Sequence, residues 1–134
     1  IQVPDEYGDL LSDGQRGFMM LTTLLSDGSP IVTPIWFTVQ GEDYLITTHP
    51  DSLKARNMRA RPAVAFAILG EGNLARYISV RGTATEALDL DAHAIQRQIV
   101  NKYEGHDPTV VREETVFRIK PSKTNAFDYS DYVA

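Results

Sequence analysis

The sequence contains no cysteine and no long apolar run. Without cysteine, the chain forms neither disulfides nor thiolate metal sites, and it has no cysteine nucleophile. Such a composition is typical of intracellular proteins, so we expect a cytoplasmic location. The longest apolar run, residues 63–69, is far too short to span a bilayer, and we expect no membrane association.

Positive charge is also scarce. The 134 residues include 13 Lys and Arg against 18 Asp and Glu, which gives a net charge of −5. Proteins that bind nucleic acid in general depend on an excess of basic residues, so we expect no nucleic-acid partner.

Several catalytic motifs are missing as well. The sequence has no Gly-x-Ser-x-Gly elbow, no Gly-x-Gly-x-x-Gly and no Walker-type loop. His49, His93 and His106 lie far apart and lack metal-binding spacing, so each is interpreted as a surface or turn residue. We therefore predict no catalytic side chain and no metal site, although His49 adjoins the basic segment described below.

The pattern of apolar residues predicts one domain over residues 1–134, since no repeat or linker is visible. Alternation predicts six strands and a 3.6-residue period predicts two helices, with a further short helix near Leu10 and Leu11. Pro34 cannot donate to a ladder, so its strand should lie at an edge or be bulged. The first three strands should form a meander, and the whole a mainly β fold, a barrel with flanking helices. The predicted strands are 18–25, 31–39, 44–48, 63–69, 77–86 and 115–120, and the helices are 53–60 and 91–103.

A basic segment between residues 47 and 61 stands out in this acidic chain. It holds four cations within eight residues, and two hydroxyls, Thr47 and Thr48, precede a predicted helix start. Lys54, Asn57 and Arg61 share one helical face by their spacing. Hydroxyls, a helix N-terminus and an ammonium together suit a phosphate group. The same spacing also fits a short solvated helix whose cations face water.

The single tryptophan, Trp36, has two interpretations. It lies opposite Ile35 and Phe37 on a predicted strand, where a half-buried strand would place it in the core. On the outer face it would instead line a cofactor groove or a dimer interface. Arg76 and Tyr77, at the entry of the fifth strand, leave the same choice open.

Taken together, these segments resemble the pyridoxamine 5′-phosphate oxidase-like split-barrel superfamily of flavin- and deazaflavin-dependent proteins. The resemblance runs from about residue 18 to residue 127 and depends on the order and spacing of its motifs. These are Met20-Leu21-Thr22-Thr23, Asp27-Gly28-x-Pro30, Thr33-Pro34-Ile35-Trp36-Phe37, Thr47-Thr48, Lys54-x-x-Asn57-Met58-Arg59, Pro62-Ala63-Val64, Tyr77-x-x-x-x-Gly82-x-Ala84 and Ile119-Lys120-Pro121-Ser122-Lys123.

The resemblance implies a six-stranded antiparallel split β-barrel of the FMN-binding type. It also implies a homodimer with two cofactor sites, each built from both subunits. Thr47, Thr48 and Lys54 would then contact the cofactor phosphate, with Asn57 beside them. Thr33, Pro34, Ile35 and Trp36 would lie along the cofactor ring, and Arg76 and Tyr77 would reach the site from the partner chain.

Within that superfamily, the Lys54-x-x-Asn57 pattern and the small size resemble the subgroup that binds coenzyme F420. The resemblance therefore implies hydride transfer from reduced F420 to a small unsaturated substrate. Ser52 stands where many F420-binding relatives have a basic residue, which keeps FMN open as the cofactor. The alternatives are an FMN-dependent oxidase or reductase and a non-catalytic flavin- or tetrapyrrole-binding protein.

Overall fold

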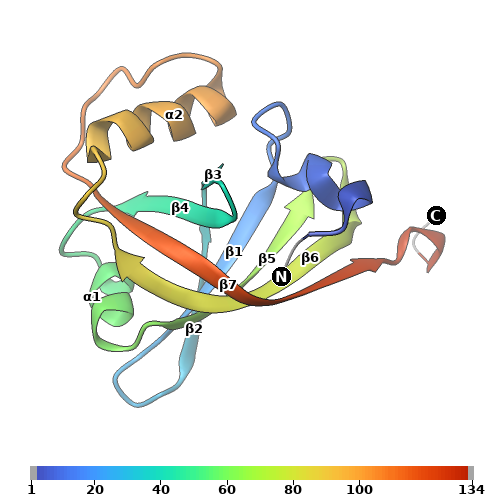
Figure 1. Cartoon of the computed structure of the whole chain (residues 1–134), viewed down its shortest axis with the longest axis horizontal. Coiled ribbons are helices and arrows are strands. Elements are labelled where there is room, and N and C mark those ends of the chain that lie inside the picture. The colour runs from blue at the N-terminus through green and yellow to red at the C-terminus, as the bar shows by residue number, and fades with distance from the viewer. Residues whose placement is uncertain (1–2, 133–134) are drawn as a thin grey trace.

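A computed structural model describes residues 3–132, and within them seven strands form one antiparallel sheet. Their order across the sheet is β2-β1-β5-β6-β7-β4-β3 (Figure 1). The strands are β1 (Phe18–Leu24), β2 (Pro30–Ile35), β3 (Thr38–Gln40), β4 (Asp43–Thr48), β5 (Ala63–Gly70), β6 (Asn73–Glu86) and β7 (Thr115–Asp128).

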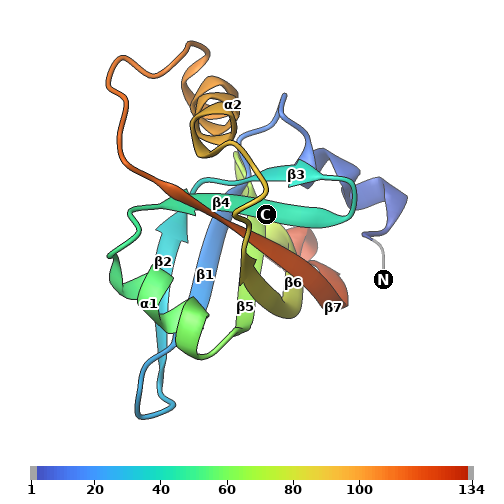
Figure 2. The same ribbon diagram turned by 60° about the vertical axis from the view of Figure 1, so that its left-hand side comes forward.

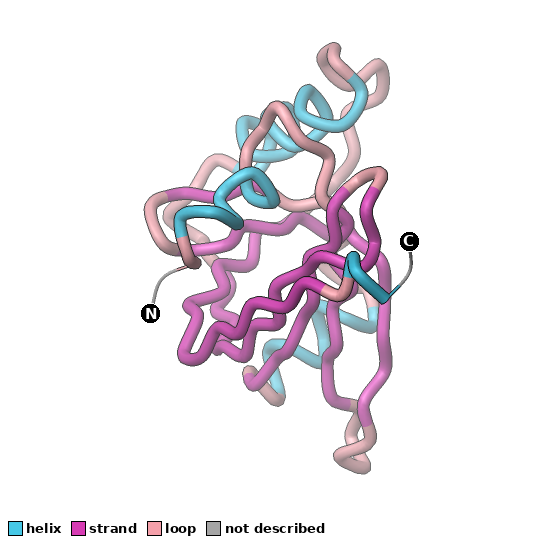
Figure 3. The backbone as a smooth tube through the Cα atoms, turned by 90° about the vertical axis from the view of Figure 1, so that its right-hand side faces the viewer, coloured by secondary structure: helices cyan, strands magenta, loops and turns pink. Residues whose placement is uncertain are grey.

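The helices lie around the outside of this sheet (Figure 3). α1 (Leu53–Ala60) has the bounds that the sequence predicts, and α2 (Ala92–Glu104) is shifted by one residue at each end. Asp91 caps α2 by accepting hydrogen bonds from the backbone N–H groups of His93 and Ala94. The short helix expected near Leu10 is the 3-10 helix η1 (Asp5–Leu11), and a second, η2 (Ser130–Tyr132), follows β7. No helix within residues 3–132 is long and apolar enough to cross a membrane.

The mainly β fold with flanking helices is confirmed, but the six-strand barrel is corrected to a seven-strand sheet that is not closed. The strand predicted over residues 31–39 breaks after Ile35, and its parts pair with different neighbours. β2 pairs with β1 and β3 pairs with β4, so the first three strands do not form a simple meander. The break has a physical cause: Phe37 turns into the core, where it is 0% exposed.

This break links the two edges of the open sheet through the chain itself, and Figure 2 shows β2 and β3 after a 60° turn of the molecule. β2 and β3 are the two edge strands, and only Trp36 and Phe37 separate them in the chain. The chain therefore carries one sheet edge directly across to the other. Pro34 lies on an edge strand, which is one of the two arrangements predicted from its missing N–H.

The sheet curves around a core of large apolar side chains. Met19, Phe37, Ile46 and Phe117 are among its fully buried members. A second, smaller cluster joins α2 to β4 and β7 through residues such as Leu45, Ile99 and Val116. This second cluster fixes the position of α2, which forms one wall of the site described below.

β6 and β7 are longer than the sequence predicts, because polar residues continue the strands beyond the apolar pattern. The ladder shifts register at Arg81 and Gly82, where Gly82 pairs with Pro121 and Ser122 bulges. A Cβ on Gly82 would lie 2.5 Å from the carbonyl oxygen of Lys120, so no larger residue fits without movement. β7 pairs with β4 only before this point and continues paired with β6 alone.

Candidate functional site

A groove of about 640 Å³ runs between the end of β2 and α2. We call it the main groove. Its sheet wall comes from the start of β1, the end of β2 and the end of β4, and its other wall from α2 and the loop before β7. The lining residues are Phe18, Met19, Pro34, Ile35, Trp36, Thr47, Gln96, Ile99, Val100, Glu104, Pro108, Thr109, Val110, Arg112 and Glu114.

A second pocket of about 570 Å³ adjoins the main groove and shares five of its lining residues. We call it the polar pocket, because charged side chains dominate it. Its cations are Lys54 and Arg112, and His49 lies beside them. The complete lining is Pro34, Ile35, Thr47, Thr48, His49, Lys54, Arg112, Glu113 and Glu114.

The start of α1 shapes the polar pocket. Ser52 is the N-cap and its hydroxyl accepts a hydrogen bond from the backbone N–H of Ala55 at 3.1 Å. Thr48 is buried, and its hydroxyl lies 2.8 Å from that of Ser52. Thr48 therefore orients the cap, while half-buried Thr47 lines both the main groove and the polar pocket.

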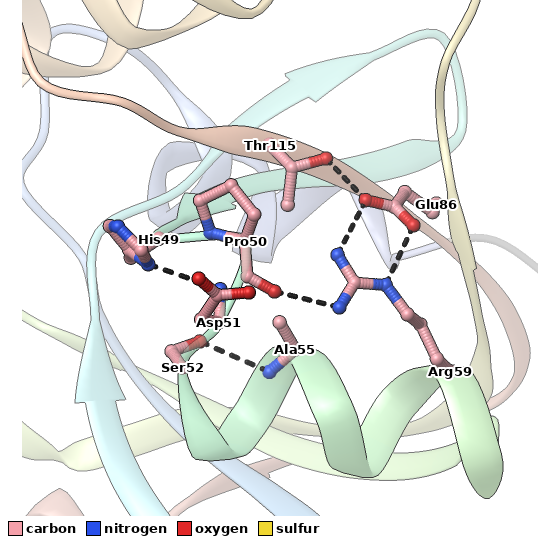
Figure 4. A network of polar contacts seen from close by, with 8 residues as sticks. All are labelled: His49, Pro50, Asp51, Ser52, Ala55, Arg59, Glu86 and Thr115. Carbon is pink, nitrogen blue, oxygen red and sulfur yellow. Dashed lines mark hydrogen bonds and ion pairs between the residues drawn. The ribbon is translucent and has the colours of Figure 1, made fainter.

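The four cations of the basic segment have different surroundings, and Lys54 is the one that lines the polar pocket. Arg59 donates to both carboxylate oxygens of Glu86 and to the carbonyl oxygen of Pro50 (Figure 4). Arg61 donates to the carbonyl oxygen of Leu24, and Arg56 is exposed on the helix.

The ion pair of Arg59 has a clear electrostatic consequence. The guanidinium of Arg59, with the hydroxyl of Thr115, lowers the pKa of Glu86 to about 2. Arg59 thus braces the loop before α1 against β6 and β7, which is a structural role.

Trp36 lies at the edge of the main groove and packs on α2. Its ring stacks on that of Tyr103 with centroids 4.8 Å apart and an interplanar angle of 2°. Tyr103 is itself buried, and its hydroxyl donates to the carbonyl oxygen of Gly17 at 2.6 Å. Trp36 remains 41% exposed, so it is a groove residue and not a core residue.

Glu114 is a half-buried carboxyl that lines both the main groove and the polar pocket. Burial raises its pKa, while a hydrogen bond from Gln96 and the charges of Arg112, His49 and Lys54 act in the opposite direction. Its neighbour Glu113 is largely exposed and lies 3.9 Å from the His49 ring nitrogen.

The structure brings together six of the ten residues that the sequence predicts for cofactor binding. Pro34, Ile35 and Thr47 line both cavities, Trp36 lines the main groove, and Thr48 and Lys54 line the polar pocket. An apolar slot with an exposed indole beside a lysine and an arginine is suited to a planar aromatic ligand that carries an anionic group.

Two of the predicted cofactor-binding residues, Asn57 of α1 and Thr33 of β2, line neither cavity. Asn57 is only 2% exposed, and its amide donates to the hydroxyl of Thr23 at 3.1 Å. Its carbonyl oxygen accepts from Arg61, so the side chain joins α1 to β1. Thr33 pairs with Leu21 in the β1–β2 ladder and lines neither cavity. Asn57 therefore faces the sheet, whereas Lys54, which the spacing places on the same helical face, lines the polar pocket.

Arg76 and Tyr77 are also absent from both cavities. Arg76 forms an ion pair with Asp9 of η1 at 2.9 Å and stacks over the ring of Tyr7. Tyr77 packs against the ring of Phe127, with centroids 5.2 Å apart. Their expected contribution from a partner chain stays a prediction.

The sequence prediction missed the helical wall and the loop that completes the site. Gln96, Ile99 and Val100 belong to an amphipathic pattern that indicates only a helix packed on a core. Residues 108–114 have no periodicity and carried no functional signal. The one clue was composition, since Arg112, Glu113 and Glu114 place three charges together.

The family model described as pyridoxamine 5′-phosphate oxidase matches residues 3–128. No curated protein matches the chain. A solved structure described as F420 reductase is 27% identical, with a TM-score of 0.76, and the match covers 92% of this chain and 98% of that one.

Other solved structures share the fold at lower identity. The conserved hypothetical protein Rv2991 from Mycobacterium tuberculosis is 21% identical, with a TM-score of 0.78, and the match covers 100% of this chain and 90% of that one. HutZ, a heme storage protein from Vibrio cholerae, is 17% identical, with a TM-score of 0.68 and coverage of 96% and 95%. At these identities the likeness shows the fold alone.

Proposed function

Because the chain belongs to the pyridoxamine 5′-phosphate oxidase family, we propose that it is a homodimeric oxidoreductase that uses coenzyme F420. It would transfer a hydride from the reduced cofactor to a small unsaturated substrate. The observation that carries the proposal is the apolar, tryptophan-lined groove that opens into a pocket with Lys54 and Arg112. The similarity to an F420 reductase at 27% identity supports F420 over FMN.

The residues present fit such a cofactor. A planar ring fits against Pro34, Ile35 and Trp36, which give an apolar surface and one exposed indole. Lys54, Arg112 and the hydroxyl of Thr47 would hold an anionic group in the polar pocket. The cofactor, when bound, supplies the hydride chemistry.

The chain's own residues would bind the cofactor, orient its ring and exclude water from it. Ile99, Val100 and Val110 are apolar residues of the wall opposite the sheet, and with a cofactor bound they would limit the access of water to the reacting face. Tyr103 fixes the plane of Trp36, so the ring beside it would be held in one orientation.

The homodimer is part of the same proposal. A row of aromatic rings, Tyr77, Phe127 and Tyr129, extends along the ends of β6 and β7, with centroid distances of 5.2 to 6.4 Å. Leu74, 62% exposed, lies on the same ribbon. A partner subunit that covers these residues would bury apolar surface and bring Tyr77 near a second site.

The test is a fluorescence titration of the purified protein with coenzyme F420 and, separately, with FMN. We expect the Lys54→Ala variant to bind F420 at least about tenfold more weakly, since a lost charge-assisted contact of about 1.4 kcal/mol has that effect. Arg56→Ala is the matched control, because it removes the same charge from an exposed position on α1.

The results of this titration distinguish the F420-dependent enzyme from the alternative functions. Tighter binding of FMN than of F420 would favour the FMN-dependent oxidase or reductase. Binding of neither cofactor would refute the proposal. Oxidation of the bound reduced cofactor by an added acceptor would distinguish an enzyme from a carrier of flavin or tetrapyrrole.

A further inference from the structure

Glu114 occupies the place where the main groove and the polar pocket meet, and it lines both. Its side chain is half-buried and accepts a hydrogen bond from Gln96 Nε2 at 3.4 Å. The other two carboxyls of these cavities differ: Glu113 and Glu104 are exposed, and each lies near a histidine ring. Glu114 is therefore the cavity carboxyl that is most shielded from water.

The groups around Glu114 determine the pKa of its carboxyl. Lys54 of α1, His49 of the loop before α1 and Arg112 of its own loop each favour the carboxylate. Burial acts against them and is the larger effect, so the pKa of Glu114 lies above its ordinary value. A carboxyl in this environment is suited to general acid catalysis.

The rest of the main groove offers a substrate mostly apolar contacts, from Ile99, Val100 and Val110. A substrate held there would be uncharged, with its reacting atoms between the sheet wall and Glu114. Reduction of a carbon–carbon double bond needs a hydride and a proton, and the proposed cofactor provides only the first.

We propose that Glu114 is the proton donor in the reduction of an apolar molecule whose double bond is conjugated to a carbonyl group. This inference rests on the proposed function. The β-carbon gains a C–H bond from the hydride of the reduced deazaflavin, and the π electrons move to the carbonyl oxygen. The α-carbon then takes the proton as the O–H bond of Glu114 breaks. The C=O bond re-forms as the α-carbon is protonated, so the substrate gains two electrons and the deazaflavin loses two, and solvent returns a proton to Glu114.

The experiment compares wild type with the Glu114→Gln variant on two acceptors, using reduced F420. Cyclohex-2-en-1-one needs a proton on carbon, whereas the dye dichlorophenolindophenol takes its protons on oxygen and nitrogen from water. We expect the ratio of enone to dye reduction to fall about 100-fold in Glu114→Gln, the size typical of a lost general acid. Glu71→Gln is the control, since Glu71 is an exposed carboxyl outside both cavities.

A second measurement is independent of turnover. The ¹³C signal of the Glu114 carboxyl, assigned by its loss in Glu114→Gln, should titrate above the ordinary range of a glutamate. Quenching of Trp36 fluorescence should give the variant an F420 affinity within about threefold of wild type, or about 0.7 kcal/mol.

The outcomes distinguish this inference from the proposed function. A wild type that binds neither F420 nor FMN overturns both. A wild type that reduces the dye but not the enone, or a variant with the wild-type ratio, overturns only the role of Glu114.

Discussion

The orientation of Trp36 in the main groove depends on Tyr103, which lies outside the groove lining. The two rings stack almost parallel, and the hydrogen bond from Tyr103 to the Gly17 carbonyl holds the pair in place. Gly17 leaves no room for a side chain, because a Cβ would lie 2.7 Å from the carbonyl oxygen of Leu10. Tyr103 thus connects the indole to the start of β1.

We predict that Tyr103→Leu weakens F420 binding about tenfold, since the loss of a fixed aromatic partner costs on the order of 1 kcal/mol. Trp36 is the only tryptophan, so its emission reports on this pair directly and should shift to longer wavelength. Tyr103→Phe keeps the ring but loses the hydrogen bond to Gly17, so it separates the contribution of stacking from that of the hydrogen bond. Equal affinity for the Leu variant and wild type would contradict the role.

Lys102 is a second residue next to this pair, and its environment is unusual. Its side chain is 8% exposed, and its Nζ lies 3.7 Å from the centre of the Phe37 ring. Within the part of the chain that the structure describes, Nζ has no hydrogen-bond partner. Burial lowers the pKa of Lys102 to about 8.

This shift predicts a pH-dependent stability. Between pH 8 and 10.5 the unfolded chain binds the Lys102 proton more tightly, so the free energy of unfolding rises with pH in that window. We expect Lys102→Met to be more stable than wild type by about 1 kcal/mol at pH 7, with the difference shrinking toward pH 10. Urea unfolding measures this, and Lys123→Met at an exposed lysine corrects for the lost charge. A difference independent of pH would contradict it.

Among single residues, the sequence predicts best where a requirement is local. The missing N–H of Pro34 predicts an edge strand or a bulge, and the structure shows the first of these. The burial of Asn57 was not predicted, because its partner, Thr23, lies 34 positions earlier and no pattern along the chain reveals that contact. Glu114 was missed for a similar reason, since its environment comes from α1, α2 and β2.

At the scale of elements, the two long strands β6 and β7 depend on one close approach. Gly82 faces the Lys120 carbonyl at the bulge, where β7 parts from β4. The bulge bends the ribbon that carries the aromatic row of Tyr77, Phe127 and Tyr129.

We predict that Gly82→Ala destabilises the protein by about 2–3 kcal/mol, because backbone must shift to admit the new methyl group. Gly8→Ala is the matched control, since nothing lies within 4 Å of its Cβ position and its effect should stay within about 0.5 kcal/mol. Thermal and urea unfolding measure both. Equal stabilities of the two variants would show that the bulge is pliable.

The elements also show why prediction succeeds for α1 and fails for β2 and β3. α1 begins at a serine cap and ends before Pro62, and both signals are local. The alternation of residues 31–39 continues through the break at Trp36 and Phe37, so it predicts one strand. The break arises from burial of Phe37, which is a tertiary effect.

For the whole molecule, we predict a dimer. Light scattering coupled to size-exclusion chromatography should give twice the chain mass of 14.9 kDa. Leu74→Glu should weaken association, because a carboxylate would replace an exposed apolar side chain on the ribbon of β6 and β7. Leu88→Glu is the matched control at an exposed leucine after β6. Monomeric wild type at micromolar concentration would contradict the prediction.

The order of strands has a consequence for how the chain is made. β4, whose residues 44–48 are synthesised early, pairs on one side with β3 and on the other with residues 115–119 of β7. About seventy residues separate these partners, and contacts so distant in sequence form slowly. On the ribosome, one side of β4 therefore stays open until residues 115–119 have been translated. During that interval the nascent protein exposes an unpaired strand edge, which is the kind of surface that chaperones protect.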